Sequence, residues 1–134
     1  MQFAVPHLSR FAFALTLLAP TFAGAADLSS LAGSEWGFGD GDPRMVQFRS
    51  AGKLAGHGGC NRFFGTYRQY DGGKLAIGPL GATRMACAGE VMEREQAFFA
   101  LLERTARAEA SHLVLKLLDA EGKELAVLKR RDFD

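Results

Sequence analysis

The sequence predicts one small α+β domain, a barrel-like curled sheet of about six to eight short strands, mostly antiparallel, packed around one main helix at about residues 90–104. Three observations predict this fold. Short runs with alternating apolar residues recur along the chain and are separated by glycine-rich turns. One longer segment in the second half lacks glycine and proline and contains strong helix formers. The length of 134 residues suits a single core, which we place in residues 26–134.

The first 25 residues have the pattern of a secretory signal peptide. A weakly basic start that includes Arg10 precedes the apolar run Phe11–Ala19, which is too short to span a bilayer. Small residues follow, and we expect cleavage after Ala25. No cysteine comes after these small residues, so a lipid anchor is not expected. We therefore expect a periplasmic or secreted protein with no retained membrane anchor; a retained anchor is the alternative.

The charge balance bears on possible partners. The chain has sixteen Lys and Arg and fifteen Asp and Glu, so loss of Arg10 with the leader leaves fifteen of each and a net charge of zero. A chain without excess positive charge lacks the usual electrostatic basis for binding nucleic acid. We therefore expect no nucleic-acid partner.

The first part of the mature chain predicts a turn, a strand and a second turn. Asp27–Ala32 has the pattern of one short helical turn capped by Asp27. Trp36 and Phe38 alternate like a strand with one buried face, and Trp36, the single tryptophan, is predicted to be a core residue. Gly39–Pro43 has the composition of a turn, and it lacks the spacing of a calcium-binding loop.

Four further runs predict two successive pairs of strands. Met45–Phe48 and Lys53–Gly56 flank a short turn. Phe63–Gln69 and Lys74–Leu80 flank a turn with an Asp-Gly core, which is typical of a hairpin. We expect Pro79 to lie at the end of its strand, because proline donates no ladder hydrogen bond. The adjacent glycines before Cys60 indicate a bulge or a close approach between backbones.

The segment Glu90–Arg104 is predicted to be an amphipathic helix. Its apolar residues fall in one stripe, and we assign three of them to the core together with Trp36: Phe98, Phe99 and Leu102. Beyond the helix, Ala106–Ala110, His112–Leu118 and Glu124–Lys129 predict a short strand followed by a second hairpin.

Glu95 does not fit the apolar stripe in which it lies. A buried carboxylate needs a charged partner or hydrogen-bond donors, because leaving it without either costs several kcal/mol. The candidates are Arg84 and the backbone amides of residues 60–62. We expect Glu95 to attach the helix to these loops; a catalytic acid is the alternative, although no second carboxylate has a matching spacing.

The only two cysteines, Cys60 and Cys87, are predicted to form a disulfide, because exported proteins fold in an oxidising compartment. Closing this loop stabilises the fold by roughly 3 kcal/mol. Two alternatives are less favoured by the pattern. His57 and His112 could complete a zinc site with the cysteines, but no Cys-x-x-Cys pair supports it. A Cys–His nucleophile pair lacks an orienting motif.

Several ordered motifs resemble the META domain (HslJ-like) family. The run from Gly59 to Tyr67 resembles its "GCN…G.Y" signature, residues 83–87 resemble its "T.MAC" element, and the helix around Glu95 is similar to the one that follows in that family. The residues of this sequence that carry the resemblance are Gly59, Cys60, Asn61, Gly65, Tyr67, Thr83, Arg84, Met85, Ala86, Cys87 and Glu95.

The resemblance implies a small barrel-like α+β domain of the bacterial envelope, associated with stress response and without established catalytic residues. We therefore expect a monomeric, non-catalytic domain, with no cofactor or metal, that binds a protein or an envelope component. The alternative is a carrier of an apolar small molecule or lipid within the curled sheet.

Overall fold

The computed structural model describes residues 2–4, 12, 14–19 and 29–132. It contains eight strands, two short 3₁₀ turns and one α-helix, α1 (Gly89–Arg104). The strands are β1 (Ser34–Gly37), β2 (Met45–Phe48), β3 (Lys53–His57), β4 (Arg62–Gln69), β5 (Leu75–Ala82), β6 (Arg107–Ala110), β7 (Val114–Leu118) and β8 (Glu124–Arg130). The 3₁₀ turns are η1 (Ser50–Gly52) and η2 (Asp71–Gly73).

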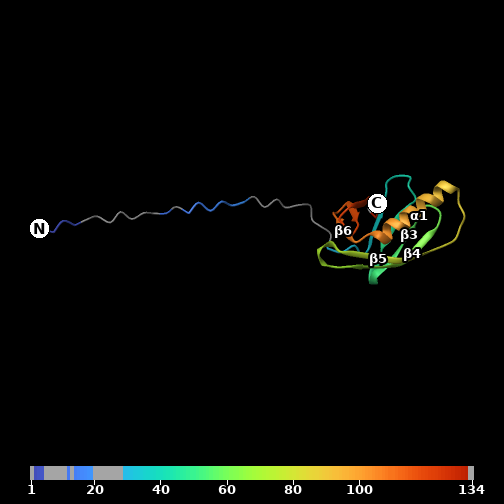
Figure 1. Cartoon of the computed structure of the whole chain (residues 1–134), viewed down its shortest axis with the longest axis horizontal. Coiled ribbons are helices and arrows are strands. Elements are labelled where there is room, and N and C mark those ends of the chain that lie inside the picture. The colour runs from blue at the N-terminus through green and yellow to red at the C-terminus, as the bar shows by residue number, and fades with distance from the viewer. Residues whose placement is uncertain (1, 5–11, 13, 20–28, 133–134) are drawn as a thin grey trace.

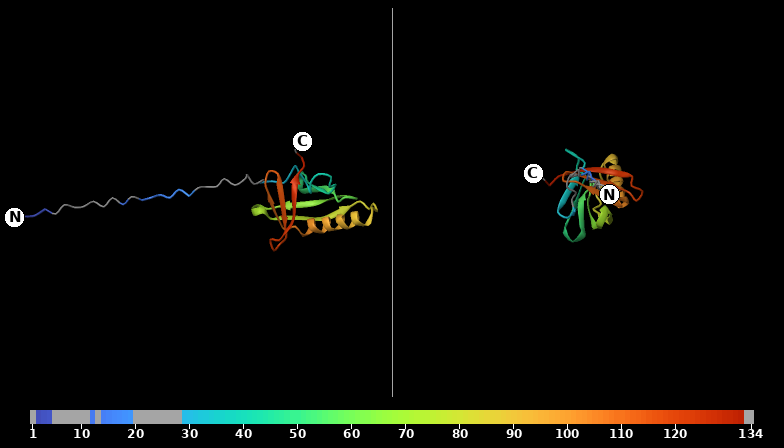
Figure 2. Two further views of the ribbon diagram at one scale, coloured as in Figure 1. Left: turned by 90° about the horizontal axis from the view of Figure 1, so that it is seen from above. Right: turned by 90° about the vertical axis from the view of Figure 1, so that its left-hand side faces the viewer.

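All eight strands belong to one antiparallel sheet with the order β5-β4-β3-β2-β1-β8-β7-β6. The sheet curls, so that the C-terminal hairpin runs across the direction of β4 and β5 (Figure 2). Its edge strands approach each other at an isolated bridge between Lys74 and Arg107, but no continuous ladder closes the sheet across the described residues. The predicted α+β class with a curled sheet around one helix is confirmed.

The helix α1 packs along β5 and β4, on the face of the sheet that carries the core (Figure 1). Phe98 makes edge-to-face ring contacts with Phe38 and Phe63, with centroids 5.4 and 5.9 Å apart. Trp36 and Leu102 are fully buried, and Phe99 packs at the edge of the core against Phe63. The four predicted core residues therefore lie in or against one hydrophobic core.

The alternation of β4 separates its two faces. Phe63 and Tyr67 are buried toward α1, whereas Phe64 and Thr66 are exposed on the opposite face. The ring of Tyr67 packs edge-to-face on Phe48, and its hydroxyl donates a hydrogen bond to a backbone carbonyl 2.8 Å away. The period of two in this strand thus gives β4 one core face and one solvent face.

Two sequence predictions differ from the structure. Pro79 lies inside β5 instead of at its end. It occurs where the register with β4 shifts, because one residue of β4, Thr66, faces Gly78 and Pro79 together. Since β5 is an edge strand with a bulge at this point, the missing amide of proline is tolerated.

The second difference concerns the start of the domain. Residues 29–32 form no helical turn, and Asp27 lies outside the described residues. Instead, Leu31 is fully buried in the core. The side chain of Gln69 accepts a hydrogen bond from the Leu31 amide at 2.9 Å and donates one to the Ser29 carbonyl at 3.4 Å. This segment is therefore attached to β4 by the Gln69 side chain.

The predicted leader is not tested by the fold, because the expected cleavage site after Ala25 lies outside the described residues. Within the part of the chain that the structure describes, no helix is long and apolar enough to cross a membrane.

The packing of Phe98 between the rings of Phe38 and Phe63 generates a stability prediction. Phe98→Ala should lower the free energy of unfolding by about 3–5 kcal/mol, because it removes buried surface and leaves a cavity between the ring contacts. Urea denaturation followed by tryptophan fluorescence would measure this. Gln96→Ala, at an exposed position of α1, is the control and should change stability by less than about 0.5 kcal/mol. Equal losses in the two variants would contradict this assignment of the core.

Candidate functional site around the Cys60–Cys87 disulfide

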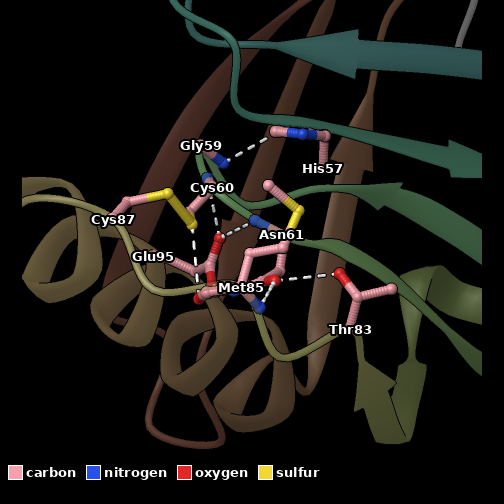
Figure 3. The surroundings of a disulfide bond; sticks show 8 residues. All are labelled: His57, Gly59, Cys60, Asn61, Thr83, Met85, Cys87 and Glu95. Carbon is pink, nitrogen blue, oxygen red and sulfur yellow. Dashed lines mark hydrogen bonds between the residues drawn. A yellow bond between two sulfur atoms is a disulfide. The ribbon is translucent and has the colours of Figure 1, made fainter.

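A disulfide joins Cys60, in the loop between β3 and β4, to Cys87, in the loop between β5 and α1 (Figure 3). The two Cα atoms are 6.0 Å apart, and the cysteines are 27 positions apart in the sequence. This confirms the predicted pairing. The bond encloses the whole β4–β5 hairpin and connects both of its ends.

Glu95 lies beside this bond and is 1% exposed. One carboxylate oxygen, Oε2, accepts hydrogen bonds from the backbone amides of Cys60 and Asn61 at 2.9 and 2.6 Å. The other oxygen, Oε1, accepts one from the Asn61 side-chain Nδ2 at 2.7 Å. The predicted attachment of α1 to the backbone of this loop is confirmed. The other candidate, Arg84, is exposed and forms no ion pair with Glu95 in the described structure.

Asn61 connects Glu95 to the second loop. Its Oδ1 accepts hydrogen bonds from the Thr83 hydroxyl at 2.9 Å and from the Met85 amide at 2.6 Å. Its Nδ2 also donates to the Met85 carbonyl at 3.2 Å (Figure 3). Both ends of this amide are therefore used, since the oxygen accepts and the nitrogen donates. An aspartate could not donate to Glu95, so a carboxamide is required here.

Two glycines let the loop approach the helix. A Cβ atom on Gly58 would lie 2.5 Å from the Glu95 Cγ and 2.8 Å from the Phe99 ring, so any larger residue would displace one of them. Gly59 has a φ of +114°, a region that favours glycine, and its amide donates to the His57 Nδ1 at 3.0 Å. The glycine pair does make a close approach, but to the side chains of Glu95 and Phe99 and not to another backbone as predicted.

The hydrogen bonds to Glu95 favour the charged form of its carboxylate. Burial disfavours the charged carboxylate, but the donors on Asn61 and Cys60 outweigh it, and the nearby His57 acts in the same direction. The pKa of Glu95 is therefore below its ordinary value. Glu95 is a buried anion held by donors, a form that does not suit a general acid at neutral pH.

The remaining motif residues divide into packed and exposed positions. Gly65 lies at the register shift, where a Cβ would be 2.7 Å from the Pro79 carbonyl oxygen. Arg84 and Ala86 are exposed, and the Met85 side chain is 61% exposed although its backbone is bound to Asn61. The motif thus combines buried residues that hydrogen-bond to one another with a loop that is exposed to solvent.

No metal centre is formed by the residues described here, since none of their His, Cys, Asp and Glu side chains gather in groups of three or more suited to a metal ion. The Cys60 and Cys87 sulfurs are bonded to each other, and His57 hydrogen-bonds to Gly59. The polar groups of the motif are directed at one another, so their arrangement holds two loops and a helix together.

Sequence reasoning missed a cleft next to this motif. It has a volume of about 340 Å³ and lies between the loop Asp40–Arg44, the Gly58–Gly59 pair and the α1 residues Val91 and Arg94. On its wall, the Arg44 guanidinium donates three hydrogen bonds to the Asp42 carboxylate and lies 4.0 Å above the Phe38 ring. The alternating Asp and Gly residues of this loop predicted only a turn. The cleft could not be predicted, because it forms between segments that are far apart in the sequence.

A family model described as META domain matches residues 24–132. Among solved structures, the chain is similar to a protein from Burkholderia xenovorans determined by NMR, with a TM-score of 0.64 and 21% identity over 85% of this chain and 99% of that one. A second NMR structure has a TM-score of 0.55 and 22% identity, covering 75% and 90% of the two chains. No curated protein matches the chain.

A third similar structure is the crystal structure of a DUF4847 family protein from Bacteroides vulgatus ATCC 8482, with a TM-score of 0.51 and 14% identity, covering 66% of this chain and 58% of that one. At these identities the likeness to solved structures shows the fold alone.

The disulfide generates a second prediction. A Cys60→Ala/Cys87→Ala double variant should fold but lose about 3 kcal/mol of stability, because the closed loop no longer restricts the unfolded chain. The fold should persist, since Asn61 and Glu95 still join the same loops. Equilibrium urea unfolding of the variant and the oxidised protein measures the difference. A variant that unfolds completely in buffer would show that the hydrogen bonds do not suffice.

The lowered pKa of Glu95 generates a third prediction. Its charged form contributes stability above the ordinary carboxyl pKa of about 4, and this contribution is lost as the pH falls through the lower pKa of the folded state. Glu95→Gln places an amide donor among three donors, so it should cost about 1–3 kcal/mol at pH 7. The difference from the unchanged protein should shrink in strong acid.

Urea unfolding between pH 2 and pH 7 measures this dependence, and Glu93→Gln, at an exposed position of the same helix, is the matched control. A Glu95→Gln penalty of the same size at both ends of the range would show that the carboxylate charge has no part in the stabilisation.

Proposed function

Because the chain belongs to the META domain family, we propose that it is a non-catalytic periplasmic domain that binds a protein or an envelope component, in the envelope stress response with which this family is associated. The observation that carries the proposal is that the motif uses its buried polar groups internally and exposes other side chains to solvent. Its buried polar groups, Glu95 and Asn61, are occupied by internal hydrogen bonds, while the loop that they hold exposes Arg84 and Met85.

The disulfide supports an oxidising compartment, since such bonds are rare in the cytosol. The leader-like composition of residues 1–25 supports export. A binding role also agrees with the rigidity of the loop, because a surface fixed before contact loses less entropy on binding.

The alternative, a carrier of an apolar molecule within the curled sheet, has weaker support. Large side chains fill the concave face, among them Trp36, Phe48, Phe63 and Phe98, each at most 1% exposed. The cleft beside the motif is lined in part by Asp42, Arg44 and Arg94 and is therefore not the apolar interior that a lipid carrier needs.

Native mass spectrometry of the protein released from the periplasm of an expressing Gram-negative bacterium tests this proposal. The expected mass is that of the chain without residues 1–25, as export requires, and is lower by two hydrogens because the disulfide is closed. After incubation with an envelope extract, a bound component should be released with its own mass unchanged. A retained leader would contradict the location, a chemically altered ligand would indicate an enzyme, and a co-purifying acyl chain would favour the carrier.

A further inference from the structure

The exposed face of β3, β4 and β5 carries a distinctive set of side chains. We define the Phe64 face by Lys53, Arg62, Phe64, Thr66, Arg68 and Gly81. On β4, residues 62, 64, 66 and 68 are all exposed and alternate with the buried Phe63 and Tyr67. Since Phe63 contacts α1, the Phe64 face is on the side of the sheet away from the helix.

Phe64 forms a flat apolar platform on this face. It is 57% exposed and lies directly opposite Ala55 on β3 and Gly81 on β5. A Cβ atom on Gly81 would lie 2.8 Å from the Phe64 ring, so the ring extends sideways across the glycine. Small residues on both neighbouring strands therefore leave the outer side of the ring open to a ligand.

Positive charge surrounds this ring, and the acid on the same side of the sheet, Glu35 on β1, is two strands away from β3 and hydrogen-bonded to Gln47. Strands β3, β4 and β5 contain no Asp or Glu, whereas Lys53, Arg62 and Arg68 are exposed and form no ion pair within residues 29–132. One strand further along the sheet, Arg49 is held over Gln47 by hydrogen bonds of 3.2 and 2.9 Å. Three cations that form no ion pair therefore lie on these strands, in a chain with a net charge of only +1.

The spacing favours an extended partner over a single small anion. Alternate residues of a strand are about 7 Å apart, so Arg62 and Arg68 are separated by about 20 Å along β4. Lys53 is the cross-strand partner of Thr66 and lies between them. One small ion could reach only one or two of these cations, whereas a polymer with repeated negative groups could contact all of them while one of its rings covers Phe64.

We propose, on the basis of the proposed function, that the Phe64 face binds an acidic polysaccharide of the envelope. The C–H face of a sugar ring packs against the negatively polarised face of the Phe64 ring. Carboxylates on adjacent sugars pair with Lys53, Arg62 and Arg68. The Thr66 hydroxyl donates to the Gly78 carbonyl at 3.3 Å, so it is placed to accept a hydrogen bond from a sugar hydroxyl. A single-stranded nucleic acid is less favoured, because such strands usually stack on several aromatic side chains and this face has one.

Isothermal titration of the purified domain with polygalacturonate tests the proposal. Binding should weaken as salt increases, since exposed cations are screened. Two comparison polymers separate the two parts of the recognition: methyl-esterified polygalacturonate keeps the sugar rings but not the charge, and polyacrylate keeps the charge but not the rings. Both should bind at least about fivefold more weakly, because each lacks one of the two contacts.

Variants connect the binding to this face. Phe64→Ala should weaken polygalacturonate binding about fivefold to tenfold with unchanged stability, since the side chain is exposed. Lys53→Gln and Arg68→Gln should each weaken binding and reduce its salt dependence. The matched controls are Leu113→Ala, at a similarly exposed apolar position, and Lys123→Gln, in the β7–β8 turn; neither should change binding.

Three results would overturn the inference: no binding of polygalacturonate, polyacrylate binding as tight as polygalacturonate with no effect of Phe64→Ala, or tighter binding of oligo(dT). None of these bears on export or on capture of another envelope component, so the mass-spectrometric test of the proposed function remains separate. Conversely, a chemically altered polygalacturonate would contradict the non-catalytic proposal while leaving the binding face in place.

Discussion

The buried carboxylate of Glu95 is the interaction on which the arrangement of this domain depends. It receives three hydrogen bonds from two consecutive residues, Cys60 and Asn61, and no arginine or lysine pairs with it in the described structure. Backbone amides that point at a carboxylate satisfy its charge without the desolvation of a second ion. The negative charge can therefore remain inside the apolar stripe of α1 and fix the helix to the loop between β3 and β4.

The disulfide and the Glu95 hydrogen bonds have different roles even though they lie side by side. The Cys60–Cys87 bond mainly restricts the unfolded chain, because it joins residues that are 27 positions apart in the sequence. Glu95 and Asn61 instead specify the folded geometry, since each donor and acceptor has one partner in a set direction.

Local patterns predicted most of the fold. The alternation in β2 and β4 and the helical stripe of α1 were sufficient to place these elements within a few residues. The misfit of Glu95 in that stripe predicted an attachment to Arg84 or to the amides of residues 60–62, because a buried charge requires a partner, and the amides of Cys60 and Asn61 proved to be the donors. Pro79 was placed wrongly, since a bulge on an edge strand depends on the register between two strands and leaves little trace in either one alone. The order of the sheet and the cleft beside Arg44 likewise arise from contacts between distant segments.

The same register also explains why the two faces of β4 differ in kind. On the inner face Phe63 and Tyr67 meet other large side chains, so their area is buried and the rings contribute to folding. On the outer face Phe64 meets Ala55 and Gly81, which are too small to cover it. An exposed aromatic ring on a strand contributes little to stability, and the cations beside it form no ion pair that would add to it. A contribution to folding therefore does not explain why the outer face has this composition. Binding to an anionic, ring-containing partner would use both the Phe64 ring and the cations.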